Sequence, residues 1–264
     1  MKVERGYKTD TTSGDRQIIF CEGTRESIDI IFYTTILGIN KDDFMLKPLG
    51  SSNTLFCYAD IALFEDGICL MDRDFKTDDE IKELETKYKI KFLRVHEVEN
   101  FLLDVNYLKK LDYIKQDIDI DSIIEDTISE NKNRLLADYL QHKINNYLNG
   151  SDYKFPRIGQ LKSHEITDED EIVKNLLYKL NQNYQKIEHK IKDIENNNIN
   201  KWKNEFNTLS LELLPGKEIL QKIKNKIFNN PPPESDIAKD MASLMCINGY
   251  MPECLHNVFF GINS

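Results

Sequence analysis

The chain has 264 residues, of which 40% are hydrophobic and 30% are charged, and its formal net charge is −10. This length allows one domain with a substantial addition, or two small domains. The acidic balance argues against a general nucleic-acid coat, because affinity for phosphate backbones comes mainly from lysine and arginine, but it leaves room for a nuclease in which a metal ion bridges acidic residues to a phosphate.

The sequence does not predict membrane insertion or secretion. No run of about 18 apolar residues, the length needed to span a bilayer, occurs in the chain. The N-terminal segment MKVERGYKTDTTSGDRQ has no apolar region of the kind found in signal peptides. The five cysteines include no C-x-x-C pair, so we expect them to pack as small hydrophobic residues rather than to form zinc sites or disulfides. We therefore expect a cytoplasmic protein.

The first predicted strand is the short apolar run Gln17–Phe20, which leads into Glu22 and Gly23. Glycine permits a tight turn there, and the apolar residues that follow, up to about residue 37, have helical spacing. Gly38 supplies a helix stop. Glu22 is therefore expected at the end of a strand and ahead of a helix.

The next segments predict a strand and a helix. Residues 42–49 predict a second strand, and Pro48 would confine its pairing to the first half. Residues 51–64 begin with N-cap residue types and continue with apolar residues, which predicts a helix.

The stretch Gly67–Phe75 (GICLMDRDF) contains the acidic pair around which the functional prediction is built. Its apolar run ends in Asp72-Arg73-Asp74, and ligands of open α/β sheets gather at the carboxyl ends of such strands. Side chains alternate along a strand with period two, so Asp72 and Asp74 share a face and can converge on one divalent cation.

A further helix and strand complete the first part of the chain. Residues 77–88 open with a Thr77 N-cap and several acids, which predicts a helix, and Ile90–Val95 predicts a fourth strand. The order β-α-β-α-β-α-β predicts an α/β fold with a four-stranded, mostly parallel sheet that has helices on both faces.

The remaining sequence predicts helices. They cover residues 121–148, 167–194, the segment from Pro215-Gly216 to about 228, and 235–245. We expect a catalytic domain over residues 15–105 and a helical domain over 106–264. A phosphate-binding G-x-x-x-x-G-K-[ST] loop does not occur in the chain, so any nucleotide control would come from a partner.

Three motifs resemble one known family. A strand followed by Glu22-Gly23 and Glu26, and a later strand that ends in Asp72-x-Asp74, look like the TOPRIM domain, the metal-dependent Rossmann-like fold of topoisomerases, primases and OLD-type nucleases. The segment His96-x-x-Glu99-Asn100-Phe101-Leu102 resembles the signature of a TOPRIM subfamily from bacterial defence islands, which includes the effector of the PARIS anti-phage system. Pro215-Gly216-Lys217 resembles a late motif of that subfamily.

The resemblance implies a site that binds one or two Mg²⁺ or Mn²⁺ ions. The implied metal ligands are Glu22, Glu26, Asp72 and Asp74. The implied further catalytic residues are Glu99 and Lys217, and the implied substrate contacts are Arg25, Arg73 and His96. From the residues alone, alternatives stay open: solvated acids at loop tips, ion pairing by the arginines, a helix cap for His96 and a solvated lysine.

The resemblance also implies a function. It points to an endoribonuclease that cleaves transfer RNA, acts as the toxic effector of an anti-phage system, is restrained by an ABC-type ATPase and dimerises for activity. DNA nicking, as in OLD-type nucleases, and a non-catalytic docking subunit are the alternatives. Lysines between 186 and 203, with Tyr184 and Trp202, could form a basic and aromatic strip for RNA, or a solvated helix face.

Overall fold

The computed structural model describes residues 16–51, 54–55, 58–59, 67–88, 90–149, 161–162, 165–166, 168–183 and 188–261. The chain forms two compact units that alternate along the sequence. The first contains the described residues up to Asp72, residues 78–93 and the segment from Pro232 onward; the second contains residues 73–77 and 94–231. This division does not coincide with a single boundary after residue 105, because the last helices of the chain belong to the same unit as the sheet.

The first unit is built on a four-stranded sheet, and all of its strand pairs are parallel. The strands are β1 (Gln17–Cys21), β2 (Phe44–Pro48), β3 (Ile68–Met71) and β4 (Ile90–Phe92), in the order β2-β1-β3-β4. The predicted α/β class with a parallel sheet is confirmed. The expected limit on β2 pairing is wrong, because the register continues to Pro48, opposite Cys21. A proline is tolerated there because β2 is an edge strand.

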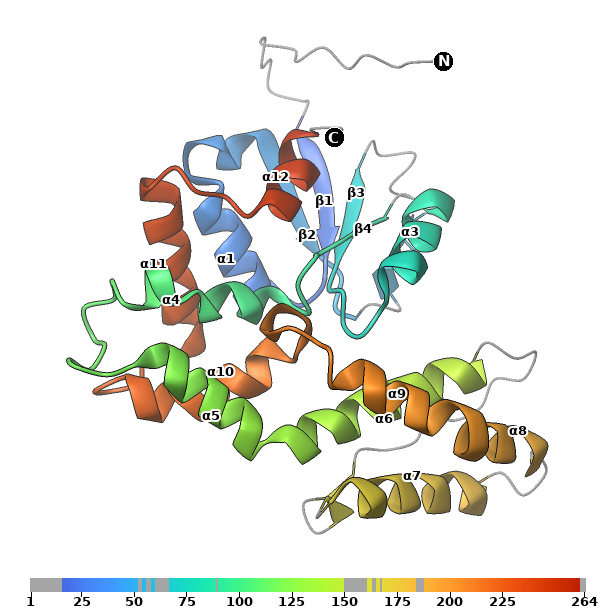
Figure 1. Cartoon of the computed structure of the whole chain (residues 1–264). Helices are drawn as coiled ribbons and strands as arrows, with labels where there is room; N and C mark the ends of the chain where they lie inside the picture. The colour runs from blue at the N-terminus through green and yellow to red at the C-terminus, as the bar shows by residue number, and fades with distance from the viewer. Residues whose placement is uncertain are drawn as a thin grey trace. The chain divides into compact units, whose positions relative to one another are not determined.

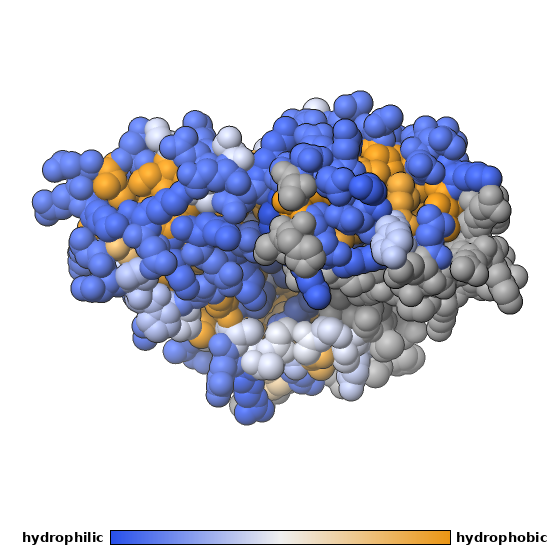
Figure 2. Space-filling model, turned by 90° about the horizontal axis from the view of Figure 1, so that it is seen from below, coloured by the Kyte–Doolittle hydropathy of each residue, from blue (hydrophilic) through white to orange (hydrophobic). Residues whose placement is uncertain are grey.

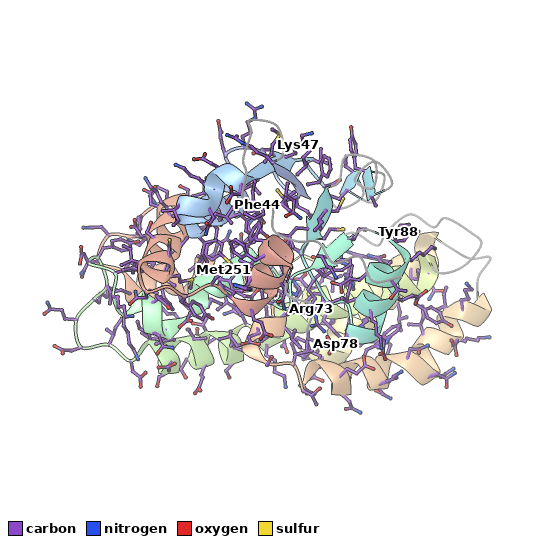
Figure 3. The ribbon with its side chains drawn as sticks, turned by 90° about the horizontal axis from the view of Figure 1, so that it is seen from above. Phe44, Lys47, Arg73, Asp78, Tyr88 and Met251 are labelled. Carbon is purple, nitrogen blue, oxygen red and sulfur yellow. The ribbon has the colours of Figure 1, made fainter. Side chains whose placement is uncertain are left out.

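One face of the sheet is covered by α1 (Ile28–Ile36) and α12 (Glu253–Phe260), and α11 (Glu234–Ile247) packs on α1 (Figure 1). Phe44 of β2, labelled in Figure 3, contacts Phe259 and Phe260 edge-on, with ring centroids 5.2 and 5.8 Å apart. Helix α11 lies close to its predicted bounds, whereas α12 was not predicted. Helix α1 ends at Ile36 with Leu37 as its C-cap, so the helix stop predicted at Gly38, whose φ is 53°, is confirmed; the 3₁₀ segment η1 (Gly38–Asp43) follows.

The opposite face of the sheet is covered by α3 (Asp78–Lys87), which begins with three acidic residues as predicted. Its Ile81 is buried in a cluster with residues from β1, β3 and β4, namely Phe20, Cys69, Met71, Ile90 and Phe92. Phe20, Cys69 and Met71 alternate with Ile19, Cys21 and Leu70, which are also buried. Burial of both faces explains why the central strands are continuous apolar runs.

The second unit is helical. Asn131 divides the predicted helix over 121–148 into two and donates from Nδ2 to the Thr127 carbonyl at 2.7 Å. Most of the predicted helix over 51–64, including Cys57, lies outside the described residues. Residues 167 and 184–187 of the predicted helix over 167–194 also lie outside them. The elements of this unit are η2 (Val98–Leu103), α4 (Val105–Leu108), α5 (Ile120–Glu130), α6 (Lys132–Asn149), α7 (Glu169–Asn183), α8 (Glu188–Asp193), the π-helical η5 (Ile194–Asn198), α9 (Ile199–Phe206), η6 (Leu211–Leu213) and α10 (Gly216–Ile227).

The face of the molecule seen in Figure 2 is mostly hydrophilic, and its hydrophobic residues lie in separate areas. In the described part of the chain, no helix has both the length and the apolar character needed to cross a membrane.

Candidate functional site

The strand order places a topological switch point between β1 and β3. Strand β1 pairs with β2 on one side and with β3 on the other, so the connections that follow β1 and β2 run in opposite directions across the sheet. In open α/β sheets, ligands bind outside the carboxyl ends of the strands at such a point. Glu22 directly follows β1 and Asp72 directly follows β3, and both side chains are half-buried. The structure therefore brings these two predicted residues to one edge of the sheet.

Two glycines shape the turn that carries Glu22. Gly23 has a φ of 88° and Gly50 has a φ of 82°, and their backbones exchange hydrogen bonds of 2.8 and 2.9 Å. This region of φ favours glycine because it lacks a Cβ. A Cβ at Gly23 would also clash with the Ser27 hydroxyl and lie 3.5 Å from Oδ2 of Asp29. Glycine at position 23 thus lets the start of α1 approach the end of β1.

Asp29, in the first turn of α1, is an acidic residue that the sequence analysis missed. Burial raises the pKa of the Cys21 thiol well above its usual range, and Asp29, Asp72 and Glu22 each add to this rise. Burial also raises the pKa of Tyr33, with further contributions from Asp72 and Asp29. All three carboxylates therefore act on the same small region at the switch point. The available signal was Asp29 lying one helical turn before the buried Tyr33.

The loop after β3 folds around Arg73, which is buried and labelled in Figure 3. Its Nε donates to the Lys76 carbonyl at 2.9 Å, and an Nη atom donates to the Arg94 carbonyl at 3.4 Å. Asp74 adopts a φ of 49°, and its amide donates to the His96 carbonyl at 2.9 Å. The Asp74 carboxylate forms an ion pair with Lys76 at 2.8 Å. Arg73 therefore stabilises this loop by binding two of its neighbouring backbone carbonyls.

His96 is buried, and its ring packs edge-on against Phe75 at 4.5 Å between centroids. Desolvation lowers the pKa of His96 to about 4, outweighing the attraction of Asp74 for the protonated ring. The ring bonds the Leu213 backbone, and Nδ1 is buried without a hydrogen-bond partner among the described residues. His96 is therefore neutral at physiological pH and gives no positive charge to a phosphate.

Two of the predicted motifs, 120 residues apart in sequence, are joined by hydrogen bonds in the second unit. The Lys217 amide donates to Oε1 of Glu97 at 2.7 Å. Glu97 and Asn100 form a capping box at the start of η2, and Asn100 Nδ2 donates to the carbonyls of Leu211 and Leu214 at 3.1 and 2.9 Å. The loop that leads into α10 is thereby tied to η2.

Glu97 is a second acidic residue that the sequence analysis missed. Desolvation and the neighbouring Glu99 raise the pKa of Glu97 to about 8, although the hydrogen bond from Lys217 and its charge oppose this rise. Glu99 is itself buried, and Lys217 is exposed. A buried acidic pair beside an exposed lysine is an arrangement often found at functional sites. The spacing Glu97-x-x-Asn100 was the available signal, because it is the spacing of a capping box.

Other predicted residues are not gathered at these positions. Arg25 and Glu26 lie in the turn before α1, and both are exposed. Trp202 is buried and Lys203 pairs with Asp170 at 3.2 Å, so these two residues do not form the exposed basic and aromatic strip that was expected. Tyr184 and Lys186, the other end of that strip, lie outside the described residues. Within the described ranges, no three His, Cys, Asp or Glu side chains are close enough to hold a metal ion by themselves.

Comparison of the chain with models of known protein families, with curated proteins and with solved structures gave no match.

Proposed function

We propose that the chain is a metal-dependent phosphodiester hydrolase whose acidic site lies at the β1/β3 switch point. The observation that carries the proposal is the position of Glu22 and Asp72 at the carboxyl ends of adjacent parallel strands, with Asp29 beside them. These side chains offer only carboxylate oxygens, and such ligands suit Mg²⁺ or Mn²⁺. All three carboxylates raise the pKa of the Cys21 thiol, and a bound cation would offset this concentration of negative charge.

Glu22 and Asp72 would contact the ion and water would supply most of its other ligands, with Asp29 adding negative charge to the same region, because no three of these side chains are close enough to hold an ion by themselves. Asp74 is two residues beyond Asp72, and the length of the chain keeps their Cα atoms within about 7 Å. A bound divalent ion polarises a phosphodiester and makes a water acidic enough to supply hydroxide near pH 7. In this proposal, the carboxylates and the ion fix the position of the phosphate.

The narrower proposal is a TOPRIM endoribonuclease that cleaves transfer RNA as a defence effector, controlled by an ABC-type ATPase and active as a homodimer. It rests on the resemblance of the motifs at 22–26, 72–74, 96–102 and 215–217. The parallel sheet and the bond between Glu97 and Lys217 support it, because motifs that act together should be brought together by the fold.

The test is cleavage of total transfer RNA and of plasmid DNA with Mg²⁺, with Mn²⁺ and with EDTA. Glu22→Gln and Asp72→Asn should each lower the rate at least about hundredfold, whereas Glu83→Gln, on the exposed face of α3, should leave it unchanged. Nicking of the plasmid alone would favour a DNA nuclease. Absence of metal-dependent cleavage, also when the ABC-type ATPase is present, would overturn the hydrolase and favour a docking subunit.

A second comparison separates the two acids near the start of α1. If Asp29 rather than Glu26 belongs to the acidic site, Asp29→Asn should impair metal-dependent cleavage more than Glu26→Gln. Asp29 and Asp72 both raise the pKa values of Cys21 and Tyr33, whereas Glu26 is exposed. The opposite order would favour the ligand set implied by the resemblance.

A further inference from the structure

The contact between η2 and the start of α10 is closer than ordinary packing. A Cβ added to Gly216 would lie 2.6 Å from the amide nitrogen of Asn100 and 2.7 Å from its Oδ1. Such distances are shorter than van der Waals contact, so only glycine fits here without a shift of the backbone. The φ of Gly216 is not positive, and closeness to Asn100 is therefore the reason for a glycine at this position.

The polar groups of Asn100 have partners on both sides of this contact. Oδ1 accepts from the Glu97 amide at 3.0 Å, and Nδ2 donates to the carbonyls of Leu211 and Leu214. Asn100 is 8% exposed, so the loss of these bonds would leave buried carbonyls unsatisfied. One side chain thus connects the first turn of η2 to the segment that precedes Lys217.

We propose that Asn100, Gly216 and Glu97 form a latch that positions Lys217 toward a phosphate group of the nucleic-acid substrate. The backbone of Lys217 is held by Glu97 at 2.7 Å, while its side chain is exposed. A lysine on a fixed backbone loses less conformational freedom when it binds a phosphate than one on a mobile loop. Asn100 and Gly216 are positioning residues in this scheme, and the inference rests on the proposed function.

The experiment is a double-mutant cycle on binding of fluorescein-labelled transfer RNA by the full chain. Asp72→Asn serves as the background, so that the RNA is not cut. Lys217→Met should weaken binding about tenfold and reduce the salt dependence by about one phosphate contact. Asn100→Ala and Gly216→Ala should weaken binding to a similar extent although they keep the lysine. In the double variants with Lys217→Met, we expect no further loss, because both changes remove the same contact.

Three measurements separate the proposal from a general loss of structure. Lys222→Met, an exposed lysine on the same helix, should leave binding unchanged. Trp202 fluorescence, from the single tryptophan, should report a folded second unit in every variant. Gly216→Ala opens no cavity and instead forces apart the contact with Asn100, so it perturbs the latch in a different way from Asn100→Ala.

The outcomes are distinct for the two proposals. Additive losses in the double variants, or full binding by Lys217→Met, would overturn the latch while the wild type still bound and cleaved RNA. A wild type that neither binds nor cleaves nucleic acid would overturn the hydrolase, and the latch would fall with it.

Discussion

Acidification should destabilise the second unit through His96. The ring is buried in the neutral form, and desolvation lowers its pKa from 6.5 to about 4. Between these two values, the unfolded chain binds a proton that the folded chain excludes. The free energy of unfolding therefore keeps its full His96 contribution above about pH 6.5 and loses it as the pH falls toward 4.

The size of the effect follows from the same two values. A fall from 6.5 to about 4 is 2.5 pKa units, and at about 1.36 kcal/mol for each unit the full loss is about 3 kcal/mol. About 2.5 kcal/mol of it should be lost between pH 7 and pH 4.5. This is a large part of the stability of an ordinary domain, which is about 5 to 15 kcal/mol.

The assay is urea unfolding followed by Trp202 fluorescence at a series of pH values. Trp202 is buried in the same unit as His96, so its signal reports the relevant transition. His96→Gln is the matched variant, because glutamine can still donate a hydrogen bond but does not titrate. The difference between the two proteins cancels the other titrating groups. Parallel curves for wild type and variant from pH 7 to 4.5 would refute the argument that His96 is held neutral by burial.

Three further predictions concern stability and thiol chemistry. Gly23→Ala should lower the free energy of unfolding in urea more than Gly50→Ala. The positive φ should cost about 1–2 kcal/mol at either position, but only position 23 also lacks space for a Cβ. Equal losses for the two variants would contradict this. Phe259→Ala should lower the free energy of unfolding of the first unit by about 3–5 kcal/mol, and a smaller loss would mean that α12 is not part of its core. Cys69 should react with iodoacetamide about a hundredfold more slowly in the folded protein at pH 8 than in urea, because burial raises its pKa from 9.0 to about 11; peptide mass spectrometry measures both rates.

The sheet could be predicted because its strands carry their own signals. Each of the two central strands is a short apolar run that ends in an acid, Glu22 or Asp72, and the residues that follow Gly23 have helical spacing. A parallel sheet follows from the alternation of strands and helices. The positions of Glu22 and Asp72 at strand ends followed from the same signals, because carboxyl ends of parallel strands lie at one edge.

The partners of the later helices could not be predicted in the same way. Hydrophobic periodicity shows which face of a helix is buried, but not which element covers it. Phe44 and Phe259 are separated by most of the chain, yet their rings lie 5.2 Å apart. Local patterns therefore assigned α11 to a helical domain and gave no sign of α12, although both belong to the unit that contains the sheet.

The same limit applies to the acids that the sequence analysis missed. Asp29 looks like an ordinary first-turn acid, since negative charge is favourable at a helix N-terminus. Glu97 looks like a solvated residue between a strand and a short helix. Their importance depends on Tyr33, Cys21 and Lys217, which approach them only in the folded chain.

Capping explains one part of the motif at residues 97–100 but not the other. Asn100 and Gly216 are accounted for by the fold, because one satisfies buried carbonyls and the other allows the close approach. The fold does not account for the two neighbouring carboxyl groups of Glu97 and Glu99. Burying like charges side by side is unfavourable, and a neutral cap would stabilise η2 without this cost. Burial raises the pKa of Glu97, and the neighbouring Glu99 raises it further. Under the proposed function, chemistry on a phosphate would give Glu97 and Glu99 a role that packing does not, and the exposed Lys217 would share that role.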